Sequence, residues 1–439
     1  MINWKLIYKV LGQLLFIEAS LLLLSLLVAV YYQQEDIFAF IVATLTTIGG
    51  GLILKWRGHG ADNSMSRRDA YLVVSLSWII FSLFGTLPFM VSGYINHFTD
   101  AYFETMSGFT TTGATILDDV ECFPHGLLFW RSLTQWIGGL GIVFFTIACI
   151  LSYYVAGMGL FDSFNYAMTT TATGGFSTHN TSTEFFHSPS LEYVCTFFCF
   201  LSGVNFTLLY AAVIKFKIKE LFRNSEFRFY IFLVTVFSIF IMVELIVMRN
   251  YDIEHAFRSA IFQVVSFITT TGLFNDDAAL WPHVTWVVLS MCMFIGACSG
   301  STSGGLKCIR GVILLRMVKN EFRQILHPNA VLPLKIDGVN VPMQKRVTLL
   351  AFLTIYLIIC VIISFTMIAM GIDNTNAITI TLSCVGNVGP TLGTEIGPTM
   401  SWSELPDLAK WFCSLMMLIG RLEIFTVLVI FTPAFWKEN

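Results

Sequence analysis

Charged residues are scarce in this sequence. Only 12% of its 439 residues are Asp, Glu, Lys or Arg, whereas about a quarter are charged in an ordinary soluble domain. The 25 basic and 28 acidic side chains leave a formal net charge of -3, which provides neither a basic surface for nucleic acid nor a polybasic membrane anchor. With 56% hydrophobic residues and a mean hydropathy of +0.74, the sequence predicts an integral membrane protein with several spans.

The sequence also lacks the paired Cys and His motifs of metal sites and disulfide frameworks. Its ten cysteines are scattered, mostly within apolar runs, without a Cys-x-x-Cys pair. Cys195 and Cys199 are one helical turn apart, which a soft metal could use, but two small apolar residues on a helix are the favoured interpretation. The spans contain no His-Glu-x-x-His or Gly-x-Ser-x-Gly motif, so the sequence predicts that the protein is not an enzyme.

Apolar runs long enough to cross a bilayer recur along nearly the whole chain. About 20 residues at 1.5 Å per residue span the ~30 Å apolar core. Basic residues cluster in the connections at 55–68, 215–228 and 307–346, which the positive-inside rule places in the cytoplasm. The predicted spans lie near 6–31, 37–56, 69–93, 126–158, 190–214, 228–249, 281–318, 345–370 and 405–436.

An internal repeat of Thr and Gly is the most informative feature of the sequence. Residues 101–113 and 260–272 share Ala, Phe, Ser and a terminal Thr-Thr-Thr-Gly without a gap. A third copy ends at 169–175, and a fourth, more divergent copy ends at 383–389. Each copy joins a helical pattern too short to cross the membrane to a Thr/Gly turn, which predicts a re-entrant hairpin.

Four such hairpins, each flanked by spans, indicate a pore with fourfold pseudosymmetry within one chain. A dehydrated cation needs rings of oxygen atoms, and backbone carbonyls supply them where the chain is extended and tightly turned, as Gly permits. One Thr-Gly cluster alone is more typical of an ordinary turn at a helix end. Three near-identical copies and a fourth in frame favour a pore.

Two helix motifs accompany these segments. Residues 129–139 read Phe-Trp-Arg-Ser-Leu-Thr-Gln-Trp-Ile-Gly-Gly, and residues 420–423 read Gly-Arg-Leu-Glu. Together with the four Thr/Gly segments they resemble the Trk/Ktr/HKT superfamily of potassium transporters, most closely its bacterial TrkH subunits. The resemblance implies an all-α polytopic membrane protein with four pseudo-repeated helix, pore-loop, helix units around one pore. Two extra N-terminal helices are expected at 1–60, and the units at 61–150, 151–225, 226–325 and 326–439.

The resemblance also implies the function. We expect potassium uptake across the bacterial cytoplasmic membrane, driven by the membrane potential, with K⁺ as the transported ion and no covalently bound cofactor. Related plant proteins with Ser at the first filter position lean toward sodium, so Gly in all four segments favours potassium. The residues expected to bind potassium, and the only metal site expected, are Thr111, Thr112, Gly113, Thr173, Gly174, Thr270, Thr271, Gly272, Asn387, Val388 and Gly389.

The expected partners follow from the same resemblance: a second copy of the chain in a homodimer, a cytosolic nucleotide-binding regulatory subunit of the TrkA type, and the lipid bilayer. Both termini are expected in the cytoplasm. A symporter that couples potassium to protons or sodium is an alternative, and so is a transport-defective truncated member. Symport would need buried carboxylates along the path, and apart from Glu104, Glu423 and acids at the mouth the sequence offers few.

A run of small and polar residues interrupts the predicted span at 281–318. Such a run cannot remain a lipid-facing helix, and it lacks the Gly-Lys-Ser/Thr ending of a nucleotide-binding loop. The resemblance makes it an intramembrane gating loop. Arg421 lies among apolar residues, where an ionised guanidinium costs roughly 2.5–3.5 kcal/mol unless paired, so we expect it to contact this loop, with Glu423 as a further candidate partner. Lys307 and Arg310 are assigned to the cytoplasmic basic set. The predicted gate residues are Gly296, Ser299, Gly300, Ser301, Thr302, Ser303, Gly304, Gly305 and Arg421.

The spacing of the filter glycines departs from the family pattern. Gly174 follows Gly113 by 61 residues. The next two intervals, to Gly272 and to Gly389, are 98 and 117 residues. Between the first two filters the chain has to cross inward and return, but the 33 residues 126–158 reach only about 50 Å, less than two crossings of ~30 Å. We therefore predict that the second unit lacks most of its first helix and the cytoplasmic loop before it. Inverting the rest of the chain would violate the positive-inside rule.

Overall fold

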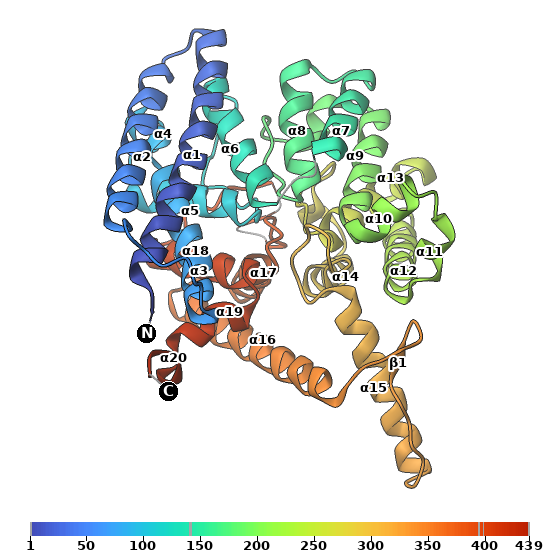
Figure 1. The fold of residues 1–439 in the computed structure, drawn as a ribbon. Helices are drawn as coiled ribbons and strands as arrows, with labels where there is room; N and C mark the ends of the chain where they lie inside the picture. Colours follow the sequence, from blue (N-terminus) through green and yellow to red (C-terminus); the bar gives the residue numbers. More distant parts are fainter. Residues whose placement is uncertain (1, 140–142, 394–395, 398, 438–439) are drawn as a thin grey trace.

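The computed structural model describes residues 2–139, 143–393, 396–397 and 399–437, and these residues are mostly α-helical (Figure 1). Among them, five helical segments are long and apolar enough to cross a membrane, or up to seven if two bent helix pairs are counted as spans. The five segments are α1 (Trp4–Tyr32), α2 (Ile37–Arg57), α3 (Arg67–Gly85) with α4 (Leu87–Val91), α12 (Ser225–Arg249) and α16 (Met343–Ala369). The chain is therefore a multi-pass membrane protein.

The first two helices form an antiparallel pair whose close approach depends on glycine. A Cβ added at Gly12 of α1 would lie 2.9 Å from the carbonyl oxygen of Gly51 in α2, so small residues let the two backbones touch. The entry to α3 is fixed by a capping box between Ser66 and Asp69, and the Asp69 carboxylate also accepts from the backbone N–H of Asn3 at 2.9 Å. The N-terminal pair is thereby anchored to the first repeat unit.

Each of the four units contains a short, buried helix that ends at a filter segment. These pore helices are α5 (Phe98–Phe109), α8 (Leu160–Ala172), α13 (Ile253–Ile268) and α17 (Asn374–Gly386). The helices after the filters are α6 (His125–Gly138), α9 (Pro189–Ser202) with α10 (Phe206–Val213), α14 (His283–Ile295) with α15 (Cys308–Leu326), and α18 (Asp407–Arg421) with α19 (Ile424–Leu428). The α9–α10 pair bends by 111°, and the pair formed by α18 and Ile424–Phe431 bends by 113°.

The remaining elements lie in the connections. They are α7 (Val143–Val155), α11 (Ile218–Arg223), α20 (Pro433–Trp436), the 3-10 turns η1 (Ser182–Phe186), η2 (Ala278–Leu280) and η3 (Val429–Phe431), and an antiparallel hairpin of β1 (Lys335–Ile336) and β2 (Val339–Asn340). Figure 1 shows α15 and this hairpin extending from the bundle, with the N- and C-termini toward the same end of the molecule.

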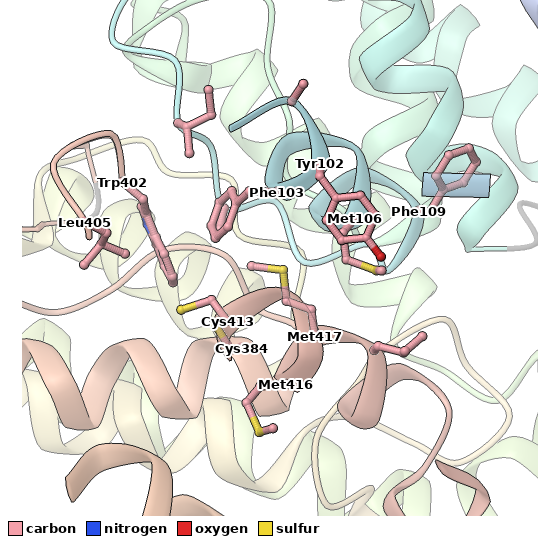
Figure 2. Close-up of a cluster of buried hydrophobic side chains, with 14 of the residues drawn as sticks. Tyr102, Phe103, Met106, Phe109, Cys384, Trp402, Leu405, Cys413, Met416 and Met417 are labelled. Carbon is pink, nitrogen blue, oxygen red and sulfur yellow. The ribbon is translucent and has the colours of Figure 1, made fainter. Parts of the chain in front are cut away.

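The apolar core has two main parts, one on each side of the filter. One joins units one and four: in Figure 2 Phe103 and Met106 of α5 lie near Met417 of α18 and Trp402 of the preceding loop. The rings of Phe103 and Trp402 are 5.7 Å apart. The other part joins units two and three through α8, α9, α12, α13 and α14. Burial of the pore-helix faces in these clusters holds the helices that carry the filter.

The predicted run at 126–158 consists of two short helices rather than one span. α6 has 14 residues and α7 has 13, so they extend about 21 Å and about 20 Å, well short of the ~30 Å apolar core. The first helices of units three and four, α12 and α16, have 25 and 27 residues. The shortening is therefore shared by both helices that flank 140–142, a segment outside the described residues.

Candidate functional site

The four pore helices end in the same backbone motif. The left-handed residue at each end has φ between 53° and 57°, and the next amide donates to a carbonyl five residues earlier over 2.8–2.9 Å. This is the Schellman arrangement, which normally places Gly in the left-handed position. Here three of the four residues are β-branched, a strained choice that surrounding structure has to enforce. The left-handed residues are Thr111, Thr173, Thr270 and Asn387.

A glycine with positive φ follows two residues later in every copy, and it corrects the register of the second filter. The four residues are Gly113, Gly175, Gly272 and Gly389, with φ of 83°, 82°, 78° and 98°. The sequence alignment put Gly174 opposite Gly113, but Gly174 supplies the Schellman amide, which donates to Thr169. The pair Gly174-Gly175 offers two matches to a Thr-Gly pattern, and only the backbone conformation distinguishes them.

The filter segments close into a ring. A Cβ added at Gly113 would lie 2.1 Å from the carbonyl oxygen of Gly174, so the first segment touches the second without room for a side chain. The other three segments approach one another in the same way. An added Cβ would lie 2.2 Å from Thr271 O at Gly175, 2.2 Å from Val388 O at Gly272, and 2.5 Å from Thr112 O at Gly389. Equivalent carbonyls thus surround one axis, and the C-terminal ends of four helices add partial negative charge. This geometry suits a dehydrated cation.

A buried ion pair fixes the first two filters to each other. Arg131 of α6 and Glu104 of α5 are 2.8 Å apart, with 2% and 0% of their side chains exposed. The Glu104 carboxylate also accepts from the backbone N–H of Ile116 at 3.0 Å, just after the first filter. Arg131 donates to the carbonyl of Ser177, just after the second filter, at 3.1 Å. Glu104 is thus paired with Arg131 and positions the backbone that follows the first filter.

Two amide side chains position individual filter segments. Gln135 of α6 donates to the carbonyl of Gly174 at 2.7 Å and accepts from the N–H of Phe176 at 3.1 Å, which clamps both sides of the second filter. Asn387 donates at 2.9 Å to the hydroxyl of Thr112 and to the carbonyl of Met417. Sequence reasoning did not single out Gln135, although its place in the quoted motif at 129–139 was a signal.

The small-residue segment between α14 and α15 lies beneath the filter. Gly304 donates its N–H to the hydroxyl of Thr270 at 2.8 Å, and a Cβ added at Gly304 would lie 2.0 Å from Gly386 O at the end of α17. The Thr302 hydroxyl is 3.4 Å from the carbonyls of Thr171 and Ser202. The predicted gate residues, Gly296, Ser299, Gly300, Ser301, Thr302, Ser303, Gly304 and Gly305, are non-helical, and we call this segment 296–307 the loop.

Arg421 at the end of α18 bridges the loop and the end of α6. Its guanidinium donates to the carbonyl of Thr302 at 2.9 Å and to the carbonyl of Gly138 at 2.6 Å. Glu423, which the sequence offered as a further partner, instead pairs with Arg310 at 2.9 Å. Arg421 therefore sits below the filter with its charge directed at backbone carbonyls rather than at a carboxylate.

Glu226 of α12 anchors the loop from the side. Its carboxylate accepts from the N–H of Ser299 at 2.5 Å, from the Ser299 hydroxyl at 3.0 Å and from the N–H of Ile309 at 3.0 Å. Asn205 donates to Ser299 O at 2.6 Å, and Phe206 donates its N–H to Gly300 O at 3.0 Å. Sequence reasoning missed Glu226 because a single acidic residue near a basic connection carries no local pattern.

A cavity of about 580 Å³ lies beneath the filter, and we call it the vestibule. Its lining includes Phe109 and Val385 from two pore helices together with Arg421, Lys307 and Arg310. The assignment of Lys307 and Arg310 to the cytoplasmic basic set is therefore incomplete: both side chains face this cavity, and the Lys307 ammonium donates to the carbonyl of Ser303. The positive φ of Lys307, 74°, turns the chain from the loop into α15.

On the opposite side of the filter lies a smaller cavity of about 80 Å³, the outer mouth. All four positive-φ glycines line it, and so does Asp118, whose carboxylate accepts from the Ser403 hydroxyl at 2.7 Å. In the same loop, hydrogen bonds from the Cys122 thiol and the Asn180 amide lower the pKa of Asp119. The mouth thus carries negative charge at neutral pH, which attracts cations.

A membrane bundle in which four helix ends and four glycine turns enclose an axis, between an acidic mouth and a larger inner cavity, defines a pseudo-fourfold cation pore. The chain belongs to the TrkH family: the family model described as "Cation transport protein" matches residues 34–152 and 140–438. The two matches overlap at 140–152, a range that includes most of α7. The family is thus one of transporters.

Individual relatives cover the full length of the chain. The Trk system potassium uptake protein TrkH of Halomonas elongata is 32% identical over 99% of both chains, and that of Escherichia coli K12 is 31% identical over 99% of this chain and 100% of its own. The crystal structure of the potassium transporter TrkH from Vibrio parahaemolyticus superposes with a TM-score of 0.94 at 31% identity, over 99% of this chain and 100% of that one.

The same comparisons bear on the short second unit. The alignment with the Halomonas protein runs over 482 positions, whereas this chain has 439 residues, so at least 43 positions have no counterpart here. The family model uses residues 140–152 twice, once at the end of its first match and once at the start of its second. The first observation shows that this chain is shorter than that relative, and the second falls between the first two filters.

Proposed function

We propose that this protein takes up potassium across the bacterial inner membrane through the ring of filter carbonyls. The observation that carries the proposal is the closed ring itself, in which each positive-φ glycine abuts a carbonyl of the next segment. We propose potassium as the ion because the relatives are named as potassium uptake proteins. The filter set comprises the predicted residues with Gly175 added at the position equivalent to Gly113.

The membrane potential suffices as the driving force. It provides about 2.3 kcal/mol per charge per 100 mV, and a tenfold gradient costs about 1.4 kcal/mol, so roughly fifty-fold accumulation needs no coupled ion. Of the described residues that line the vestibule, Glu423 is the only acidic one, and it is paired with Arg310. Glu104 is paired with Arg131. These pairings favour channel-like uptake over a symporter that would protonate a free carboxylate.

We further propose that the loop and Arg421 form the gate. Arg421 holds the loop to the end of α6 below the filter, so a cation leaving the filter meets a guanidinium and a tightly turned backbone. Opening then requires the Thr302 and Gly138 contacts to break. We propose two partners for this gate. One is a cytosolic nucleotide-binding subunit of the TrkA type that acts on the basic connections, and the other is a second copy of the chain in a homodimer.

The orientation follows from the same basic residues. Arg316, Lys319 and Arg323 on α15 place that helix in the cytoplasm by the positive-inside rule, and both chain ends lie toward the α15 end of the molecule (Figure 1). We therefore propose cytoplasmic termini and an outward-facing mouth. The acidic residues of the mouth, Asp118 and Asp119, suit that side.

The test is flux into sealed vesicles with Gly113→Ser. At φ 83°, with 2.1 Å to Gly174 O, the new Cβ has to displace the ring, so the preference for potassium over sodium should fall. Gly93→Ser is the matched control, because Gly93 has φ 78° but an added Cβ would meet nothing within 4 Å. Unchanged selectivity in Gly113→Ser would refute the filter assignment. An unaltered protein without any flux would support the transport-defective alternative, and dependence on a proton or sodium gradient would support symport.

A further inference from the structure

We propose that the vestibule binds an anionic phospholipid of the inner leaflet, with an acyl chain against its apolar wall and the phosphate at Lys307 and Arg310. The cavity lining combines two kinds of side chain. Lys307, Arg310 and Arg421 are basic, and Glu423 is the one acidic residue among the described residues of the lining. Much of the rest is apolar or aromatic and includes Leu14, Ile17, Phe81, Phe352 and Tyr356, with Phe352 directly beside Arg310. An anionic amphiphile matches both kinds.

The cavity reaches the outer face of the bundle beside α1. α6 packs along α1 but ends at Gly138, which lines the vestibule together with Leu14 and Ile17 of α1. The ten residues of α1 before Leu14 continue about 15 Å further toward the inner surface. Ile17 is 52% exposed although it lines the cavity. The apolar face of α1 therefore offers an acyl chain a lateral path at the depth of the inner leaflet.

The charges of the basic residues are incompletely balanced. Three basic side chains line the cavity with one carboxylate, and the carboxylate of Glu226 interacts with Lys307 from outside the lining. Arg310 pairs with Glu423 at 2.9 Å while its guanidinium stacks 4.0 Å over the ring of Phe352. The Lys307 ammonium has three donors and donates to the carbonyl of Ser303. An excess of positive charge in a low-dielectric cavity favours an anion, and phosphate oxygens can accept from both Lys307 and Arg310.

An unpartnered hydroxyl points to the same occupant. Tyr356 is 2% exposed and lines the vestibule, and among the described residues its hydroxyl oxygen has no hydrogen-bond partner. A buried hydroxyl without a partner costs free energy, whereas the ester carbonyl of a lipid between phosphate and acyl chain is an acceptor at the required boundary. Free phosphate would satisfy the basic residues but would leave the apolar wall uncovered.

The experiment uses the full chain in phosphatidylcholine vesicles that contain a small fraction of a lipid with a photoactivatable diazirine on its acyl chain. The probe headgroup is either phosphatidylglycerol or phosphatidylcholine. After irradiation, mass spectrometry locates the adducts. We expect adducts on Phe352 and Tyr356, which are 6% and 2% exposed. The anionic probe should form more of these adducts than the phosphatidylcholine probe, and we call this difference the anionic excess. Phe365 of the same helix is 72% exposed and should react equally with both probes, since it faces bulk lipid.

Three variants make the result decisive. Lys307→Gln should lower the excess of anionic adducts at Phe352 and Tyr356 by about fivefold, the factor for ~1 kcal/mol per basic residue. Lys319→Gln, at an exposed lysine of α15, should leave this excess unchanged. Ile17→Trp fills the cavity from α1 and should suppress these adducts while leaving those on Phe365.

Several outcomes would overturn the proposal. Adducts confined to exposed residues such as Phe365 would show that no lipid enters, and equal labelling of Phe352 by the two probes would show that the cavity does not select an anionic headgroup. Loss of the anionic excess when millimolar inorganic phosphate is added would assign the basic residues to free phosphate instead. Because the readout is an adduct and not flux, failure here leaves the potassium filter tested separately by Gly113→Ser.

Discussion

The ion pair between Glu104 and Arg131 gives a sharp test of how the filter is held. Glu104→Gln leaves Arg131 buried, with 2% of its side chain exposed and without its counter-charge. Removing one partner of a buried pair typically costs about 3–5 kcal/mol. Gln is also a weaker acceptor for the N–H of Ile116 and the hydroxyl of Thr115. These hydrogen bonds hold the segment that follows the first filter in the sequence. We therefore expect both a lower melting temperature and reduced selectivity for potassium.

The double variant Glu104→Gln, Arg131→Met separates charge from packing. Removing both charges eliminates the unpaired guanidinium, so much of the lost stability should return, although the bond from Arg131 to Ser177 O is also lost. Glu220→Gln is the matched control, since Glu220 pairs with Lys217 at 2.9 Å but both side chains are more than half exposed. An exposed pair contributes about 0–1 kcal/mol, so this control should be nearly silent.

The assays are thermal unfolding of the purified protein and potassium and sodium flux in vesicles. Refutation would come from a Glu104→Gln protein with unchanged melting temperature and unchanged selectivity. A third outcome has a different meaning: if that variant keeps its stability and selectivity but loses a dependence of flux on the proton gradient, Glu104 carries a proton and the symport alternative gains support. The structure favours a loss of stability and selectivity in Glu104→Gln, because both carboxylate oxygens of Glu104 accept hydrogen bonds.

Three further predictions concern the gate, its anchor and the orientation. Arg421→Ala removes the bonds to Thr302 O and Gly138 O and should raise basal potassium flux, and deletion of 300–304 should do the same; unaltered flux and regulation in both would place the barrier elsewhere. Glu226→Gln weakens three hydrogen bonds to the ends of the loop and should increase leak with little change in selectivity, measured as the potassium-to-sodium flux ratio. In a Cys122→Ser background, which removes the exposed native thiol, a cysteine introduced near residue 220 should react with impermeant reagents only from the cytoplasmic side, and its labelling from outside would show an inverted chain.

Local patterns in the sequence were sufficient for several parts of this architecture. The five long spans follow from hydropathy, and the four pore segments follow from the Thr/Gly repeat, because both are properties of contiguous residues. The predicted spans at 126–158 and 281–318 are wrong as single helices, since each is interrupted. The short connection between the first two filters was also visible, since 126–158 is too short for two crossings. The non-helical character of the loop followed from its small residues, which cannot face lipid as a helix.

The partnerships within the pore were decided only by the tertiary structure. Gln135 clamps the second filter from 39 residues away, Glu226 holds the loop from 73 residues away, and Arg421 reaches Gly138 across 283 residues. Even the choice between Gly174 and Gly175 required the backbone conformation, since both satisfy the same Thr-Gly pattern. Such contacts form where helices from different units converge on one axis. The type of a residue does not predict which distant backbone group the fold will bring next to it.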